Sequence, residues 1–145
     1  MKRVLKCPKS ALLPRAKKAR QAFLSRALTR LYPCAECALQ YEGDPFRLLV
    51  MARLSAQCTD KRVNMHTPAL FMRFPTPQML AEATFEEVYD LIKSISFPNN
   101  KAKHLATLSR QIVEKFGGEV PSDPKELESL QGVGRKTANV VGAVL

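Results

Sequence analysis

Leu130 to Val141 read "LQGVGRKTANVV", and this stretch decides the fold. Gly132 and Gly134 flank Val133, so the backbone there can adopt positive φ and another chain can approach it closely. We expect the side chain of Val133 to point inward and close the turn. From Arg135 onwards apolar residues recur at helical spacing, which predicts a helix that starts at this point. The unpaired amides at a helix start, together with the helix dipole, attract an anion. The stretch therefore predicts a helix–turn–helix whose turn and second helix can bind phosphate.

Four kinds of site could contain such a turn. A nucleotide P-loop needs G-x-x-x-x-G-K-[ST] after a strand, whereas "GVGRKT" is shorter and follows a predicted helix. A dinucleotide-binding fold needs G-x-G-x-x-G in a βαβ unit, but Thr137 occupies the position of the third glycine. Two interpretations remain open on local spacing: a plain tight turn between two helices, and a backbone clamp on a nucleic-acid strand.

The rest of the chain also predicts helices, separated by clear breaks. Asp44-Pro45 and Asp123-Pro124 each place an N-cap before a proline at the first helical position. Thr84 and Glu87 form a capping-box pattern, and Gly117-Gly118 should end a helix. No segment alternates with period two, so we predict an all-α fold with about eight helices. The expected helices cover residues 14–32, 45–58, 61–74, 77–83, 85–95, 101–116, 124–130 and 135–145, and Asp60 is the expected cap of the third.

The basic charge lies at the N-terminus. The chain has 145 residues, with 23 Lys and Arg against 13 Asp and Glu, a net charge of +10. Residues 1–35 contain ten of the basic residues and no acidic residue, so the remainder is neutral overall. Such an arm often contacts nucleic acid or an acidic surface, and it also resembles an organelle transit peptide. No apolar run approaches the roughly 20 residues needed to cross a bilayer, so we expect no membrane association.

The cysteine pattern does not predict a metal site. Cys34 and Cys37 form one C-x-x-C, while Cys7 and Cys58 are single and distant in the sequence. A structural zinc site usually needs two ligand pairs. His66 and His104 are isolated, and we expect them to pack or to be solvated rather than to bind metal.

Four blocks of sequence, in a fixed order, carry a resemblance to a known family. "LQGVGRKTANVV" resembles the helix-hairpin-helix of the endonuclease III family of DNA glycosylases and abasic-site lyases. "LLVMARLSAQCTDKRVN" at 48–64, "SFPNNKAKHL" at 96–105 and "GGEVPSDPKELESL" at 117–130 are similar to further blocks of that family. The similarity runs from about residue 15 to residue 145. The resemblance implies the helix-hairpin-helix DNA glycosylase fold, with its six-helix domain largely present.

The same resemblance implies roles for particular residues. Lys136 is at the position of the family's Schiff-base nucleophile. Gln57 is at the position of the residue that fills the gap left by a flipped base, and Phe97 is at that of a wedge residue in the opposite strand. The hairpin would bind backbone phosphate without reading sequence, through Gln131, Gly132, Val133, Gly134 and Arg135.

The chemistry is compatible with these roles but does not require them. A lysine amine attacks a sugar C1′ only when it is neutral, and the positive helix end and Arg135 both favour the neutral form of Lys136. Lys136 could equally be a cation that binds phosphate. Gln57 could be a polar residue on a largely buried helix, and Phe97 could belong to the core. Pro98 favours a loop position for Phe97, where an apolar wedge would suit kinked DNA.

The sequence also departs from the family pattern. The family has a catalytic aspartate after the hairpin and a 4Fe–4S cluster bound by four cysteines spaced C-x6-C-x2-C-x5-C. Neither occurs in these 145 residues, so we expect no cofactor, a missing iron–sulfur domain and impaired base excision in a truncated chain. The family's second domain pairs the N-terminal helix with the missing segment, so the apolar side chains of 14–32 should be exposed. Gln131 also replaces the usual proline, which removes a preset φ and blocks nothing.

These observations lead to one functional hypothesis and one alternative. We expect a base excision repair enzyme, a DNA N-glycosylase with abasic-site lyase activity, acting as a monomer on duplex DNA with damaged bases or abasic sites. The alternative is a non-catalytic DNA-binding helix-hairpin-helix module. We expect a basic leader at 1–13, a helix at 14–36 that belongs to the family's second domain, and a helical domain at 37–145. A bacterial cytoplasmic location fits best, with organelle targeting by the basic N-terminus as the other possibility.

Overall fold

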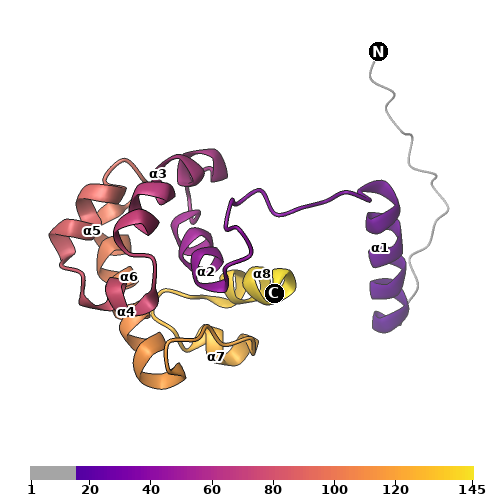
Figure 1. Ribbon diagram of the computed structural model, residues 1–145. Helices are drawn as coiled ribbons and strands as arrows, with labels where there is room; N and C mark the ends of the chain where they lie inside the picture. Colours follow the sequence, from indigo (N-terminus) through magenta and orange to yellow (C-terminus); the bar gives the residue numbers. More distant parts are fainter. Residues whose placement is uncertain (1–15) are drawn as a thin grey trace, which may run out of the picture. The chain divides into compact units, whose positions relative to one another are not determined.

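A computed structural model describes residues 16–145, and within this range every regular element is an α-helix (Figure 1). The helices are α1 (Lys17–Leu31), α2 (Pro45–Leu54), α3 (Asp60–Arg73), α4 (Pro77–Glu82), α5 (Phe85–Ile92), α6 (Pro98–Phe116), α7 (Pro124–Glu128) and α8 (Arg135–Val144). The all-α prediction is confirmed. The basic leader expected at 1–13 lies outside the described residues.

The chain divides into two compact units, Met1–Glu36 and Cys37–Leu145. In the described part of the first unit the one helix is α1, and none of its residues is buried. Its large apolar side chains are exposed, as expected from the sequence: Phe23, Leu24, Leu28 and Leu31. The second unit contains α2 to α8 and the hydrophobic core. No helix among the described residues is long and apolar enough to cross a bilayer.

Side-chain caps fix where most helices of the second unit begin. Asp44 accepts hydrogen bonds from the backbone amides of Phe46 and Arg47, so α2 starts at Pro45 as predicted. Thr84 and Glu87 form the complete capping box, which confirms the predicted start of α5. Asp123 caps α7 in the same way as Asp44 caps α2.

Several predicted boundaries were wrong, among them one helix cap, one helix end and one helix start. The cap of α3 is Thr59, whose hydroxyl accepts from the amide of Arg62, and Asp60 is the first helical residue. A threonine N-cap with an acidic residue after it satisfies both the free amides and the helix dipole, so Asp60 is not needed as the cap. Helix α2 ends at Leu54 rather than Cys58, and α6 begins at Pro98 rather than Lys101, because proline is well suited to a first helical turn.

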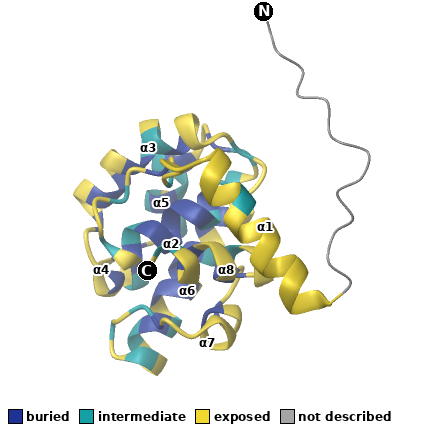
Figure 2. Cartoon of the chain, turned by 90° about the vertical axis from the view of Figure 1, so that its right-hand side faces the viewer, coloured by how far each residue is buried: buried dark blue, intermediate teal, exposed yellow. Residues whose placement is uncertain are grey.

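All the helices from α2 to α8 contribute side chains to the core of the second unit. Four successive residues of α2, Leu48 to Met51, are fully buried, so this helix is surrounded by others on all sides (Figure 2). Helix α6 packs against α4 and α5, and α2 packs against α8. Along one face of α6, Leu105, Leu108 and Ile112 are buried, whereas Val113 and Phe116 towards its end are half-buried. The core thus holds α8, which carries Lys136, against α2, which leads to Gln57.

Candidate functional site

The hairpin between α7 and α8 is attached to the rest of the second unit through Val133 and Gln131. Val133 is 5% exposed and its amide donates to the carbonyl of Leu130, so the valine closes the turn as the sequence predicts. The amide of Gln131 donates to Oε1 of Gln111 on α6, at 2.7 Å. Gly134 caps α8 without a side-chain hydrogen bond, so no side chain competes for the amides of the first turn. The turn is therefore anchored to the core, and the amides that begin α8 remain free for a ligand.

The two glycines of the hairpin act differently. Gly132 has φ +77, and a Cβ built on it would lie 2.5 Å from Nε of Arg53 and 3.2 Å from Nδ1 of His104. Two features therefore favour glycine at position 132: the left-handed backbone, and the lack of space for a side chain against Arg53 and His104. Gly134 has φ −90, which any residue adopts, and nothing lies within 4 Å of the Cβ position. Its missing side chain leaves open space in front of the start of α8.

Arg53 and His104 form the support beneath Gly132. The guanidinium of Arg53 lies 2.9 Å from Nδ1 of His104 and has only donors to offer, so this imidazole nitrogen must accept and the ring must be neutral. Burial lowers the pKa of His104, and the nearby charge of Arg53 lowers it further. Burial likewise lowers the pKa of Arg53. The Arg53–His104 pair beside Gly132 is therefore stable with Arg53 charged and His104 neutral, and is destabilised when both are charged.

This pair makes the stability of the protein depend on pH. His104 has a depressed pKa in the folded state, so the unfolded chain takes up its proton first as the pH falls below 6.5. Stability is full above that pH and decreases as the pH falls towards the folded pKa. We expect the thermal unfolding midpoint of the wild type to drop more between pH 7 and pH 5 than that of His104→Asn, which keeps an acceptor and does not titrate. Parallel profiles for the two proteins would show that His104 is not responsible.

Lys136 lies in the first turn of α8 and is exposed. Its side chain lines a cavity of about 470 Å³, whose walls are made by α2, α3, α8 and the segment before α2. Gln57 and Asp60 line the same cavity, together with Cys37, Leu39, Ala52, Ser55, Ala56, Thr137 and Val140. The fold therefore brings Lys136 and Gln57, distant in sequence, to one concave site. Arg135 does not line this cavity, and it forms an exposed ion pair with Glu128 at 3.7 Å, which contributes little.

Asp60 was missed as a site residue, since the sequence suggested only a helix cap. It is a carboxylate that lines the same cavity as Lys136. The sequence signal that could have identified Asp60 is its position three residues after Gln57, where the next helix begins. A carboxylate in the same cavity as an amine can stabilise a positive charge that develops there during a reaction.

Gln57 and Phe97 lie in two separate turns with the same unusual backbone. Their φ values are 55 and 54, in the left-handed region that side-chain-bearing residues seldom adopt. Both side chains are exposed, and Phe97 is 62% exposed. Phe97 is therefore not a core residue, and it caps α6 without a side-chain hydrogen bond. Exposed side chains on strained turns are typical of functional positions.

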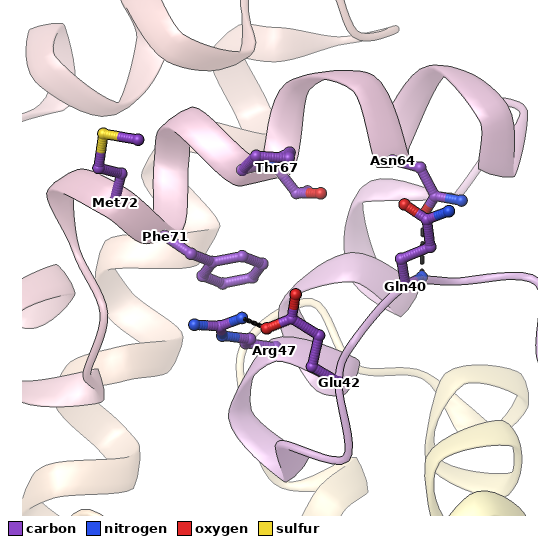
Figure 3. Close-up of a pocket in the computed structure, with 8 residues that line it drawn as sticks. Gln40, Glu42, Arg47, Asn64, Thr67, Phe71 and Met72 are labelled. Atoms are coloured by element: carbon purple, nitrogen blue, oxygen red, sulfur yellow. Dashed lines mark hydrogen bonds and ion pairs between the residues drawn. The ribbon is translucent and has the colours of Figure 1, made fainter.

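A second cavity, of about 330 Å³, lies between α2, α3 and the segment before them (Figure 3). Its polar groups bond to one another. Asn64 bridges the carbonyl of Ala38 and the amide of Gln40, while Arg47 pairs with Glu42 and lies 5.4 Å from the centre of the Phe71 ring. Neither Lys136 nor Gln57 lines this cavity. Its side chains hold the segment before α2 against α3, and we assign it no ligand.

In the described part of the chain no group of three or more His, Cys, Asp and Glu side chains comes close enough to hold an ion. Cys34, Cys37 and Cys58 are free thiols.

Comparison with known proteins gives consistent matches. Residues 50–144 match the model of the HhH-GPD superfamily of base excision DNA repair proteins. Endonuclease III of Synechocystis is 51% identical over 126 residues, covering 87% of this chain and 57% of that protein. Endonuclease III of Bacillus subtilis is 49% identical over 114 residues, covering 79% of this chain and 52% of that protein. This chain thus spans little more than half the length of these relatives.

Solved structures give the same picture. A trapped endonuclease III–DNA covalent intermediate matches with a TM-score of 0.79 and 40% identity, covering 89% of this chain and 60% of that chain. A non-covalent endonuclease III–DNA complex matches with a TM-score of 0.77, also at 40% identity, covering 88% of this chain and 59% of that chain. The match to the superfamily model, residues 50–144, contains the hairpin and, of the cavity residues, Gln57, Asp60 and Lys136.

Proposed function

Since the chain belongs to the HhH-GPD superfamily of base excision DNA repair proteins, and within it to the endonuclease III family, we propose that it is a DNA glycosylase with abasic-site lyase activity. One observation carries the proposal: Lys136, at the start of the hairpin's second helix, lines the same cavity as Gln57 and Asp60. A hairpin that binds phosphate would thereby place a lysine amine beside a cavity able to hold an extruded nucleotide.

The hairpin supplies the binding to the DNA backbone. The free amides at the start of α8, the dipole of that helix and the charge of Arg135 all favour a phosphate. The open space at Gly134 lets the strand approach the backbone closely. None of these groups reads a base edge, so this contact carries affinity and not sequence preference.

Lys136 supplies the chemistry. At an abasic site the neutral amine attacks C1′ of the ring-opened sugar, and loss of water leaves an iminium ion. The iminium draws electrons from the neighbouring C2′–H bond, whose proton passes to solvent. The C3′–O bond then breaks with its electron pair on the departing phosphate, and the strand is nicked. Water later hydrolyses the iminium and restores the lysine. On a damaged nucleotide, the same attack would displace the base from C1′.

Asp60 is suited to a supporting role in this reaction. Asp60 lines the same cavity as Lys136, and its carboxylate can stabilise the positive charge that develops at C1′. Gln57 is suited to filling the space that an extruded nucleotide leaves in the duplex, and Phe97 to wedging the opposite strand. All these residues come from one chain, and the relatives compared are bacterial. We therefore propose a monomer that works on DNA in a bacterial cell.

A second candidate function rests on the exposure of Lys136. An exposed lysine in the first turn of a helix can serve simply as a cation for phosphate. The protein would then be a DNA-binding module that does no chemistry. Both candidates bind DNA, and they differ in whether a covalent bond to the sugar ever forms.

Binding itself is tested by its dependence on salt. We expect the affinity for a duplex with one abasic-site analogue to fall by about 100-fold between 50 and 200 mM salt, on the basis of about four phosphate contacts. Fluorescence anisotropy with a labelled duplex measures this slope. A binding constant that does not change with salt would contradict both candidate functions, because each depends on contacts to phosphate.

A further inference from the structure

Lys101 is a buried lysine that the proposed reaction does not use. It lies in the first turn of α6 and is 2% exposed. Among the described residues no carboxylate lies within ion-pairing distance of its ammonium group. Nζ instead donates to the backbone carbonyls of Leu54 and Ala56, both at 2.8 Å. A buried ammonium is costly unless its hydrogen bonds are made, so these two contacts are the reason it can stay there.

The two carbonyls belong to the turn that carries Gln57. Helix α2 ends at Leu54, where the helix dipole places partial negative charge, and Lys101 neutralises that end. Ala56 immediately precedes Gln57, whose own carbonyl accepts from Oγ of Ser96 at 2.6 Å. Two side chains from residues 96–101 therefore hold three carbonyls of the turn around Gln57.

The same short segment carries Phe97. Ser96 immediately precedes it, and the amide of Lys101 donates to the carbonyl of Phe97 at 3.2 Å. Lys101 thus fixes the Phe97 turn through its backbone and the Gln57 turn through its side chain. The described chain has three residues other than glycine with positive φ, and these contacts tie two of them together. Such a backbone is strained for a residue with a side chain and persists only where its surroundings determine it.

We propose that Lys101 is a positioning residue which, with Ser96, locks the Gln57 and Phe97 turns into one rigid unit for insertion into DNA at a lesion. The inference rests on the proposed function, because it assumes that both side chains enter the duplex. Two inserted side chains must reach opposite strands at one step, and a unit that already holds them in place loses little entropy on binding. Lys101 does not touch DNA or the reacting atoms.

The test compares the affinity for a duplex containing an abasic-site analogue with that for the same duplex intact. Only insertion separates these two affinities, because the phosphate contacts are common to both. The quantity measured is the affinity for the abasic duplex divided by the affinity for the intact duplex. We expect Lys101→Met, which keeps the buried stem and removes the donors, to reduce this ratio by about tenfold. The affinity for the intact duplex should stay within about twofold. Gln57→Ala should reduce the ratio to a similar extent.

A double-mutant cycle separates positioning from plain structural damage. If Lys101 acts through Gln57, the variant with both substitutions should be no worse than the poorer single variant. Losses that add, or an equal loss for both duplexes, would overturn the inference. If Lys101→Met does not fold, Ser96→Ala can be used instead. It removes the hydrogen bond from Ser96 to the carbonyl of Gln57 and leaves Lys101 in place. The same non-additive loss with Gln57→Ala is expected there, and additive losses would again overturn the inference.

Measurements on the wild-type protein distinguish a failure of this inference from a failure of the proposed function. A wild-type protein that binds both duplexes equally would refute insertion, and with it the function on which the inference rests. A wild type that prefers the abasic duplex, combined with a Lys101→Met variant that keeps the full preference, would refute only the role of Lys101.

Discussion

Replacing Lys136 with arginine should abolish strand nicking at an abasic site while the protein still binds the DNA. Arginine keeps the positive charge next to the phosphate, but its guanidinium stays protonated and cannot attack a sugar carbon. We expect the nicking rate to fall by about 1,000-fold or more, the scale of loss when an enzyme is deprived of its nucleophile. The dissociation constant should change by less than about threefold. Gel analysis of a duplex with one abasic site measures the first quantity and anisotropy the second.

Lys136→Ala and Lys115→Ala complete this comparison. The alanine variant at Lys136 loses both the nucleophile and the charge, so it should lose nicking and some affinity. Lys115 is exposed in the last turn of α6 and does not line the cavity, so Lys115→Ala should change neither quantity. Full nicking by Lys136→Arg would leave only the phosphate-binding role for this lysine.

Gly132→Ala should cause the second large effect, a loss of DNA binding through damage to the hairpin. The left-handed backbone at φ +77 costs an L-residue about 1–2 kcal/mol. The new Cβ would also lie 2.5 Å from Nε of Arg53, so Arg53 must move and its contact with His104 breaks. We expect the free energy of unfolding to drop by about 2 kcal/mol. The DNA affinity should fall at least about tenfold, because the amides of the turn shift away from the phosphate.

Gly142→Ala is the matched control for this variant. It makes the same substitution inside α8, where the nearest atom outside the helix lies 3.8 Å from the new Cβ, an ordinary contact. Alanine is a better helix former than glycine by about 1 kcal/mol, so this variant should be at least as stable as the wild type and bind DNA equally well. Chemical denaturation and anisotropy measure both proteins. Wild-type DNA binding by Gly132→Ala would show that the geometry of the turn does not determine affinity.

Residues that act locally could be predicted from the sequence. The caps at Asp44, Thr84 and Asp123 determine helix starts through bonds to amides two or three residues away, and all three were predicted correctly. Val133 in the hairpin also behaves as predicted. Where two local signals competed, as at Thr59 and Asp60, the wrong one was preferred.

Contacts between distant segments could not be predicted in the same way. A lysine in a helix normally has its charge in water, so nothing in a single sequence says that Lys101 bonds to the carbonyls of Leu54 and Ala56. A weak signal existed, since Lys101 continues the buried stripe of Leu105 and Leu108 towards the start of α6. The pairing of Arg53 with His104 beneath Gly132 gave no local signal, because it depends on how α2, α6 and the hairpin meet in space.

The claim that Lys136 attacks the sugar is tested most directly by trapping its covalent product. The protein is incubated with a duplex containing one abasic site, the iminium is reduced with sodium borohydride, and the peptide attached to DNA is identified by mass spectrometry. We expect a stable adduct on the peptide that contains Lys136, and none with Lys136→Arg. An adduct on another residue, or no adduct from a protein that demonstrably binds the duplex, would contradict the proposed lyase mechanism.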